Sequence, residues 1–183
     1  MADEHADTPV TTQGGQPNGL DNGPAIGLIS QYVKDFSFEN PNSPQVYQWT
    51  SQPNVDVQFG ISANGVADGV HESVIKIDIS ATHPEGPSFV IDLSYAGLFG
   101  VRNVPDDQVH AFMLAEAPRI LFPFARRLVA DAVRDGGFAP LLLDPIDFHG
   151  LYLQQQQQMA AAQGGGENGG GDDFVDTQTF GNA

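Results

Sequence analysis

The sequence contains no cysteine, which excludes disulfide bonds and thiolate metal sites. It is also poor in basic residues, because only 7 lysines and arginines accompany 23 carboxylates, and the formal net charge is −16. Nucleic acids and anionic membrane surfaces are therefore unfavourable ligands, since phosphate groups are bound by clustered lysines and arginines. Soluble basic partners are favoured by electrostatic attraction, although the charge alone identifies none of them.

Long hydrophobic runs are also missing, and no segment approaches the length of a membrane span. The N-terminal residues MADEHADTPVTTQGGQPNG include neither the basic region nor the apolar region of a secretory signal. From these two absences the sequence predicts a cytoplasmic protein.

Both ends of the chain are acidic, lack lysine and arginine, and are rich in small or polar residues. Residues 1–25 are dominated by Gly, Pro, Thr and Gln, whereas residues 154–183 join a glutamine run to a Gly-rich stretch. Neither end has enough apolar surface to offset the entropy lost on ordering, so we predict flexible acidic tails. Residues 26–153 then form one domain with a single core.

Within this domain, segments near residues 32–39, 54–61, 72–80 and 88–95 alternate between apolar and polar residues. A period of two is typical of a strand with one buried face, and the turn-rich connections favour antiparallel pairing. We therefore predict a four-stranded antiparallel sheet with one face exposed to solvent. The apolar faces of the last three segments comprise Val55, Val57, Phe59, Ile61, Ile75, Ile77, Ile79, Phe89, Ile91, Leu93 and Tyr95.

The first of these segments has two unlike faces. Alternation predicts an inner face that comprises Tyr32, Lys34, Phe36 and Phe38. It predicts an outer face that comprises Val33, Asp35, Ser37 and Glu39. Phe36 and Phe38 would attach the strand to the interior, while Asp35 and Glu39 would present carboxylates to solvent as a docking surface.

The apolar spacing changes to three and four residues after Pro105, which predicts a long helix that ends before Gly136. Pro118 and Pro123 lie inside this stretch and predict a kink or a break. A second, short helix is predicted from about Asp144 to Leu153, before the glutamine run. Strands followed by helices indicate an α+β fold.

The residue types that most often carry chemistry are scattered along the chain. The histidines do not pair at helical spacing, and they are His5, His71, His83, His110 and His149. Asp35 and Glu39 would lie about 13 Å apart on a strand, which is wide for the two carboxylates of a glycosidase. We therefore predict no catalytic site, metal or cofactor. Two alternatives stay open, namely a small acidic hydrolase or carbohydrate-binding sheet protein and an acidic module that binds a basic partner.

Three motifs together resemble one known family. YVKDFSFENPNSP, DLSYAGLFG and RILFPFAR occur in this order and are similar to motifs of the SecB protein-export chaperones, over roughly residues 28–158. The resemblance implies a four-stranded antiparallel sheet followed by two helices. It implies an ATP-independent cytoplasmic holdase without enzymatic activity, assembled as a homotetramer, a dimer of dimers. Such a protein binds unfolded precursor proteins and passes them to the motor SecA, whose basic C-terminal zinc-binding tail docks on an acidic sheet surface.

The resemblance also implies roles for particular residues. The SecA-docking positions of the family fall on Asp35, Glu39, Val90 and Asp92. Here Val90 replaces a leucine and Asp92 replaces a glutamate, and both replacements keep the chemical character with a shorter side chain.

The family's client groove and subunit interface are matched less closely by this sequence. Its groove tryptophan corresponds to Ser51, two residues after Trp49. Tyr47 and Trp49 follow a proline-flanked turn, where large side chains often line a groove. The candidate groove residues are Tyr47, Trp49, Leu98, Phe99 and Phe138. The candidate interface residues on the long helix are Val109, Phe112, Met113 and Leu128.

Overall fold

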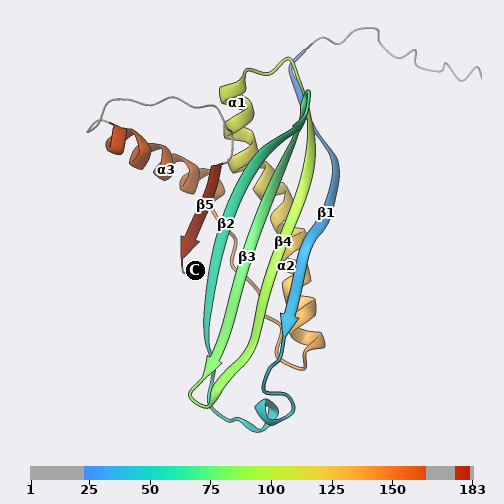
Figure 1. The fold of residues 1–183 in the computed structure, drawn as a ribbon, viewed down its shortest axis with the longest axis vertical. Coiled ribbons are helices and arrows are strands. Elements are labelled where there is room, and N and C mark those ends of the chain that lie inside the picture. Colours follow the sequence, from blue (N-terminus) through green and yellow to red (C-terminus); the bar gives the residue numbers. More distant parts are fainter. Residues whose placement is uncertain (1–22, 164–175, 182–183) are drawn as a thin grey trace, which may run out of the picture.

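The computed structural model describes residues 23–163 and 176–181, and in this part of the chain one antiparallel sheet packs against helices (Figure 1). The strand order is β1-β4-β3-β2-β5. The strands are β1 (Ala25–Glu39), β2 (Asn54–Ala67), β3 (Val70–His83), β4 (Gly86–Arg102) and β5 (Asp176–Gly181). The first four strands confirm the predicted antiparallel sheet, and long hairpins connect β2, β3 and β4.

The helices follow the first four strands, as predicted. They are α1 (Asp106–Ala111), the π turn η2 (Phe112–Glu116), α2 (Ala117–Asp135) and α3 (Phe148–Gln163), whereas the short η1 (Gln45–Gln48) lies between β1 and β2. The π turn ends two residues before Pro118, whose missing N–H cannot continue the regular hydrogen-bond ladder. Pro123 lies inside α2. The long helix is therefore irregular near its prolines.

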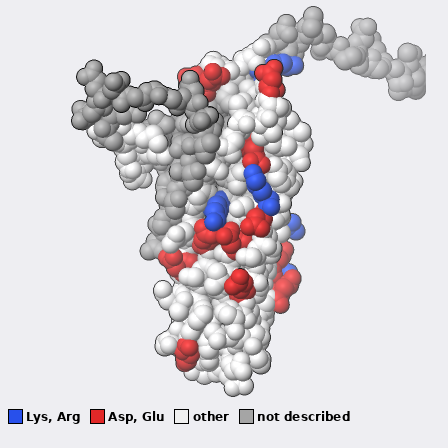
Figure 2. All heavy atoms as spheres, viewed as in Figure 1, with Lys and Arg blue, Asp and Glu red and all other residues white. Residues whose placement is uncertain are grey.

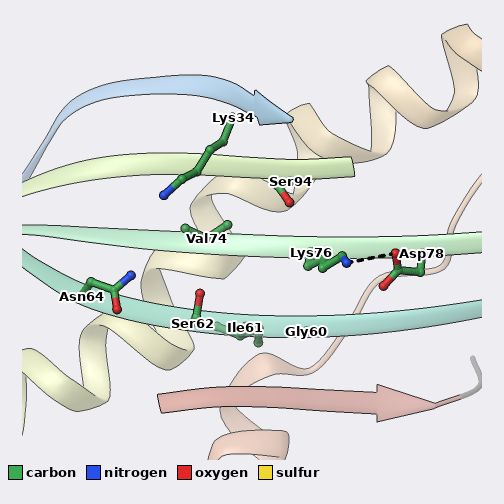
Figure 3. A pocket seen from close by; sticks show the side chains of 9 residues that line it. All are labelled: Lys34, Gly60, Ile61, Ser62, Asn64, Val74, Lys76, Asp78 and Ser94. Atoms are coloured by element: carbon green, nitrogen blue, oxygen red, sulfur yellow. Dashed lines mark ion pairs between the residues drawn. The ribbon is translucent and has the colours of Figure 1, made fainter. Parts of the chain in front are cut away.

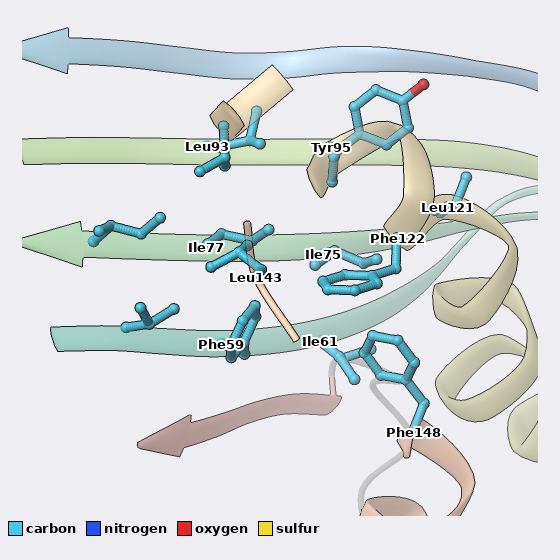
Figure 4. Packing of buried hydrophobic residues seen from close by; sticks show 14 of the residues in the cluster. Phe59, Ile61, Ile75, Ile77, Leu93, Tyr95, Leu121, Phe122, Leu143 and Phe148 are labelled. Carbon is cyan, nitrogen blue, oxygen red and sulfur yellow. The ribbon is translucent and has the colours of Figure 1, made fainter. Parts of the chain in front are cut away.

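The hydrophobic core lies between the sheet and the helices (Figure 4). Ile75 and Leu93 from the centre of the sheet and Leu121 of α2 are all fully buried in this core. Phe122 of α2 and Phe148 of α3 meet edge to face, with ring centroids 5.6 Å apart. The side chains predicted from alternation for the inner faces of β2, β3 and β4 are buried, except that Val55 is half-buried, and Val74 on the opposite face of β3 is buried as well.

The register of β1 corrects the predicted faces of the first strand. Val33 pairs with Tyr95 and Phe36 pairs with Leu93, but a β-bulge lies between Val33 and Asp35. Directly opposed residues share a face, so Val33 and Phe36 lie on the helix side. Tyr32, which pairs with Ala96, lies on the outer side.

The prediction that Tyr32 and Lys34 share a face with Phe36 and Phe38 is therefore wrong. Lys34 points to the outer side, where its Nζ binds Glu72 of β3. The cause is the extra residue of the bulge, which shifts the alternation by one position within a single strand.

The C-terminal residues contain more regular structure than alternation alone indicated. Helix α3 continues through the glutamine run to Gln163, and residues 176–181 pair with β2 as strand β5. The predicted N-terminal tail falls almost entirely on residues 1–22, which lie outside the described residues, as do residues 164–175 and 182–183. No helix in the described part of the chain combines the length and apolarity needed to cross a lipid bilayer.

Candidate functional site

The outer face of the sheet brings together the four predicted docking residues. Asp35 and Glu39 project from β1, and in the register of β4 they lie opposite Ser94 and Val90. Asp92 lies between these two positions, opposite Ser37 of β1. We call this surface of Asp35, Glu39, Val90 and Asp92 the acidic face. Figure 2 shows acidic side chains gathered over this side of the sheet, with a few basic side chains beside them.

The charge of the acidic face is partly neutralised by Lys76. Its Nζ lies 3.5 Å from Asp78 Oδ1 and 3.4 Å from Asp92 Oδ2. The charge of Asp78 and the hydrogen bond to Asp92 raise the pKa of Lys76, so the lysine stays protonated. Half-exposed ion pairs stabilise a fold only slightly. Within the described residues neither Asp35 nor Glu39 takes part in an ion pair, so both carboxylates are available to a partner.

A buried carboxylate holds β1 in place beside this face. Glu72 of β3 accepts a 2.5 Å hydrogen bond from the Tyr32 hydroxyl and a 2.6 Å bond from Lys34 Nζ. Burial pushes the pKa of Glu72 upward, but the bonds from Lys34 and Tyr32 outweigh it and leave the pKa below its ordinary value. The same bond to Glu72 raises the pKa of Tyr32 to about 12. Because Lys34 is the extra residue of the bulge and Tyr32 lies just before it, these bonds orient the segment that carries Asp35.

We expect Glu72→Gln to lower the free energy of unfolding by about 1–3 kcal/mol at neutral pH, since a buried charge-assisted network loses its acceptor. The folded-state pKa of Glu72 is lowered, so its contribution is present above the ordinary value of 4.5 and is lost as the pH falls through the folded value. The difference between the two proteins should therefore shrink below pH 4.5. Urea unfolding from pH 3 to 8 measures it. Asp68→Asn, which removes a carboxylate on an exposed turn, is the control and should leave the free energy of unfolding at neutral pH nearly unchanged.

A shallow hollow of about 270 Å³ adjoins the acidic face (Figure 3). Small residues form its floor, since Gly60 and Ser62 of β2 and Ser94 of β4 leave space above the sheet. Lys34 and Lys76 lie at its border. The hollow gives the surface beside the carboxylates enough relief to receive a side chain.

A second candidate surface lies where β1 and β4 approach the end of α2. The ring of Tyr47 lies 5.7 Å from that of Phe138, and Phe138 lies 5.0 Å from Phe89. Phe89 in turn stacks on Phe38 at 6.0 Å. Tyr47 donates a 2.8 Å hydrogen bond to the Gly136 carbonyl but keeps 51% of its surface exposed. We call Phe38, Tyr47, Phe89 and Phe138 the aromatic cluster.

A sequence model of the family described as preprotein translocase subunit SecB matches residues 20–159. The chain belongs to the SecB family. Its relatives include the protein-export protein SecB of Sphingopyxis alaskensis, 66% identical over 155 residues, or 85% of this chain and 90% of that protein. The protein-export protein SecB of Novosphingobium aromaticivorans is 59% identical over 139 residues, which are 76% of this chain and 80% of that protein.

The fold is also that of a solved SecB-like chaperone. The Mycobacterium tuberculosis protein Rv1957, in complex with a peptide from the Rv1956 HigA1 antitoxin, superposes with a TM-score of 0.56 at 14% identity. The match covers 66% of this chain and 90% of that one. The SecB family consists of protein-export chaperones and not of enzymes. This membership decides against the hydrolase alternative.

The geometry around Ser51 also differs from a hydrolytic site. Ser51 Oγ lies 2.9 Å from His83 Nδ1 and donates a 3.2 Å bond to Glu85. In a catalytic triad the imidazole lies between the hydroxyl and the carboxylate, whereas here the hydroxyl lies between the other two. Trp49, 5.2 Å from the His83 ring, packs on this cluster and lies away from the contacts of Tyr47 with Phe138.

The remaining groove and interface candidates of this SecB-family chain are dispersed. Phe99 is fully buried against Phe112, at 5.6 Å, while its neighbour Leu98 is half-buried on the outer side. Val109 and Met113 are buried in the core of the same chain. The half-buried candidates on the long helix are Phe112 and Leu128.

The structure adds an exposed apolar strip that the alternation pattern missed. Val33 and Phe36 of β1 and Phe124 of α2 are 44%, 40% and 40% exposed. Phe124 stacks on Tyr95, the residue paired with Val33. Helix α2 packs mainly on β3 and β4, so Val33 and Phe36 of β1 are left partly exposed. We call Val33, Phe36 and Phe124 the apolar strip. Alternation could not identify this strip, because it assigned Phe36 to the buried face of its strand.

Proposed function

We propose that this member of the SecB family is an ATP-independent holdase that binds unfolded precursor proteins in the cytoplasm and delivers them to SecA. The observation that carries the proposal is the separation of two unlike surfaces. Carboxylates occupy the outer side of the sheet, whereas exposed aromatic and apolar side chains occupy the helix side and the end of α2. One surface suits a basic partner and the other suits apolar client segments.

Client binding is assigned to the aromatic cluster and the apolar strip. Unfolded chains expose apolar side chains, and burial of such surface is worth about 25 cal/mol per Å². Tyr47 and Phe138 lie in contact, and Tyr47 is half exposed, so a client side chain can pack on them without rearrangement of the core. Contacts of this kind tolerate many sequences, which a general chaperone needs.

SecA docking is assigned to the acidic face. A basic zinc-binding tail would meet the free carboxylates of Asp35 and Glu39 on β1. Asp92 and the apolar Val90 lie beside them on β4. Complementary charge of this kind increases the rate of encounter and selects the partner.

Assembly as a homotetramer is supported by apolar side chains on the edge strand. Leu28 and Ile29 of β1 are 42% and 60% exposed, and Phe112 and Leu128 are half-buried on the long helix. A run of such residues at a sheet edge favours association with another copy. A tetramer would also present several client surfaces to one long chain and raise its avidity.

We expect the protein to suppress aggregation of a slow-folding precursor at stoichiometric amounts without ATP. The physical reason is that the aromatic cluster and the apolar strip cover the apolar segments through which the precursor aggregates. Light scattering during dilution from denaturant measures this, and solution mass measures assembly in the same sample. Tyr47→Ala combined with Phe138→Ala should reduce the suppression severalfold at unchanged solution mass. If the natural protein leaves scattering unchanged, it is not a holdase.

A further inference from the structure

The outer edge of β2 is occupied by the chain's own C-terminal segment. Residues Asp176–Gly181 run antiparallel to β2, in a register that joins Asp176 to Ala63 and Gly181 to Gln58 (Figure 1). Figure 3 shows the same strand beside the part of β2 that carries Ser62 and Gly60. Strand β5 is thus the last strand of the sheet on this side.

Strand β5 pairs with only a short part of β2, and its contacts with the rest of the domain are few. Strand β5 covers only residues 58–63 of β2, whereas β3 pairs with β2 from Asn54 to Ala67. Among the element pairs with substantial contact, β5 contacts only β2. Strand β5 has six residues and pairs with the sheet along one edge only.

The sequence between α3 and β5 gives this segment a tether. This stretch, residues 164–175, has the sequence GGGENGGGDDFV. Because β5 belongs to the same chain as β2, it occupies the edge intramolecularly. The segment therefore competes for the edge of β2 with any extended chain supplied in solution.

We infer that the edge of β2 over residues 58–63 is a strand-acceptor site for extended client segments, and that Asp176–Gly181 is its built-in, displaceable occupant. The inference rests on the proposed holdase function. Extended peptides commonly bind by adding a strand to a sheet edge, where backbone hydrogen bonds give affinity without a sequence requirement. An edge left open would also pair with other copies of the chain. The C-terminal strand protects the edge until a client displaces it.

Removal of β5 is the first test. A chain that ends at Val175 should bind reduced, carboxymethylated α-lactalbumin, a permanently unfolded probe, about fivefold more tightly, because the competing occupant is gone. Amide hydrogen exchange at residues 58–63 should become faster in the shortened chain and slower again when the probe is added. A synthetic peptide of residues 172–183 added in trans should reverse both effects.

A full-length variant separates pairing from loss of residues. Thr177→Pro with Gln178→Pro removes two consecutive N–H groups, one of which points to β2 because successive N–H groups of a strand face opposite sides. It should reproduce the tighter binding at unchanged net charge. Thr177→Ser with Gln178→Thr keeps both N–H groups and should bind the probe as the natural chain does.

The possible outcomes are distinct. Equal affinity of the full-length and shortened chains, with faster exchange at residues 58–63 in the shortened one, would overturn the inference but leave the holdase function standing. Unchanged exchange would overturn it because the segment then does not protect the edge. If no chain, including the natural one, binds the probe, the proposed function itself fails and the inference fails with it.

Discussion

Asp35→Lys combined with Glu39→Lys is expected to abolish binding of the zinc-binding tail of SecA. Both carboxylates are exposed on the outer side of β1 and are free of ion pairs within the described residues. The substitutions replace two attractive charges with two repulsive ones, and like charges opposed across an interface cost several kcal/mol. Titration calorimetry with the isolated SecA tail measures the loss.

Client binding by the same variant should stay within about twofold of the natural protein, because the acidic face and the apolar surfaces lie on different sides of the fold. Asp68→Lys combined with Asp135→Lys makes the same change in net charge at exposed positions off the acidic face. This control should keep most of the SecA affinity. The two surfaces would not be separate sites if client and SecA binding fell together in the Asp35 and Glu39 variant.

Phe99→Ala is expected to lower the free energy of unfolding by about 3–5 kcal/mol, the usual cost of deleting a fully buried phenylalanine ring. Phe99 has no exposed surface, and its ring packs edge to face on Phe112. The vacated space lies between β4 and the long helix, where the backbone hydrogen bonds of both elements limit collapse. Urea unfolding at one fixed protein concentration measures the change, since assembly makes stability depend on concentration.

Tyr47→Ala is the matched comparison for Phe99→Ala. Tyr47 loses its hydrogen bonds with Gly136 and Asn40, which are worth about 1 kcal/mol each, but leaves no buried cavity. Tyr47→Ala should therefore weaken client binding more than it lowers stability, and Phe99→Ala should do the reverse. A stable Phe99→Ala protein that no longer binds clients would assign Phe99 to the groove after all.

Much of the fold was predictable because its signals are local. Alternation identified the buried faces of residues 54–61, 72–80 and 88–95, since the period of two in a regular strand depends only on backbone geometry. The change of spacing after Pro105 identified the helical half of the domain. The motif order identified the family, and Asp35, Glu39 and Asp92 lie on one side of the sheet.

The rest depended on partners far away in the sequence. The bulge at Lys34 moves Tyr32 and Lys34 to the outer side, where Glu72 of another strand stabilises them. Phe36 stays 40% exposed because α2 packs mainly over β3 and β4.

The sequence by itself determined the strands, the helices, the acidic charge and the family, because each follows from residues close together in the chain. Tertiary structure alone decided which aromatic residues are exposed, since exposure depends on which element lies above them. Phe99 is buried and Tyr47 is open for this reason. It also decided that residues 176–181 pair with β2, because a strand needs an edge in register and no local pattern specifies which edge is free.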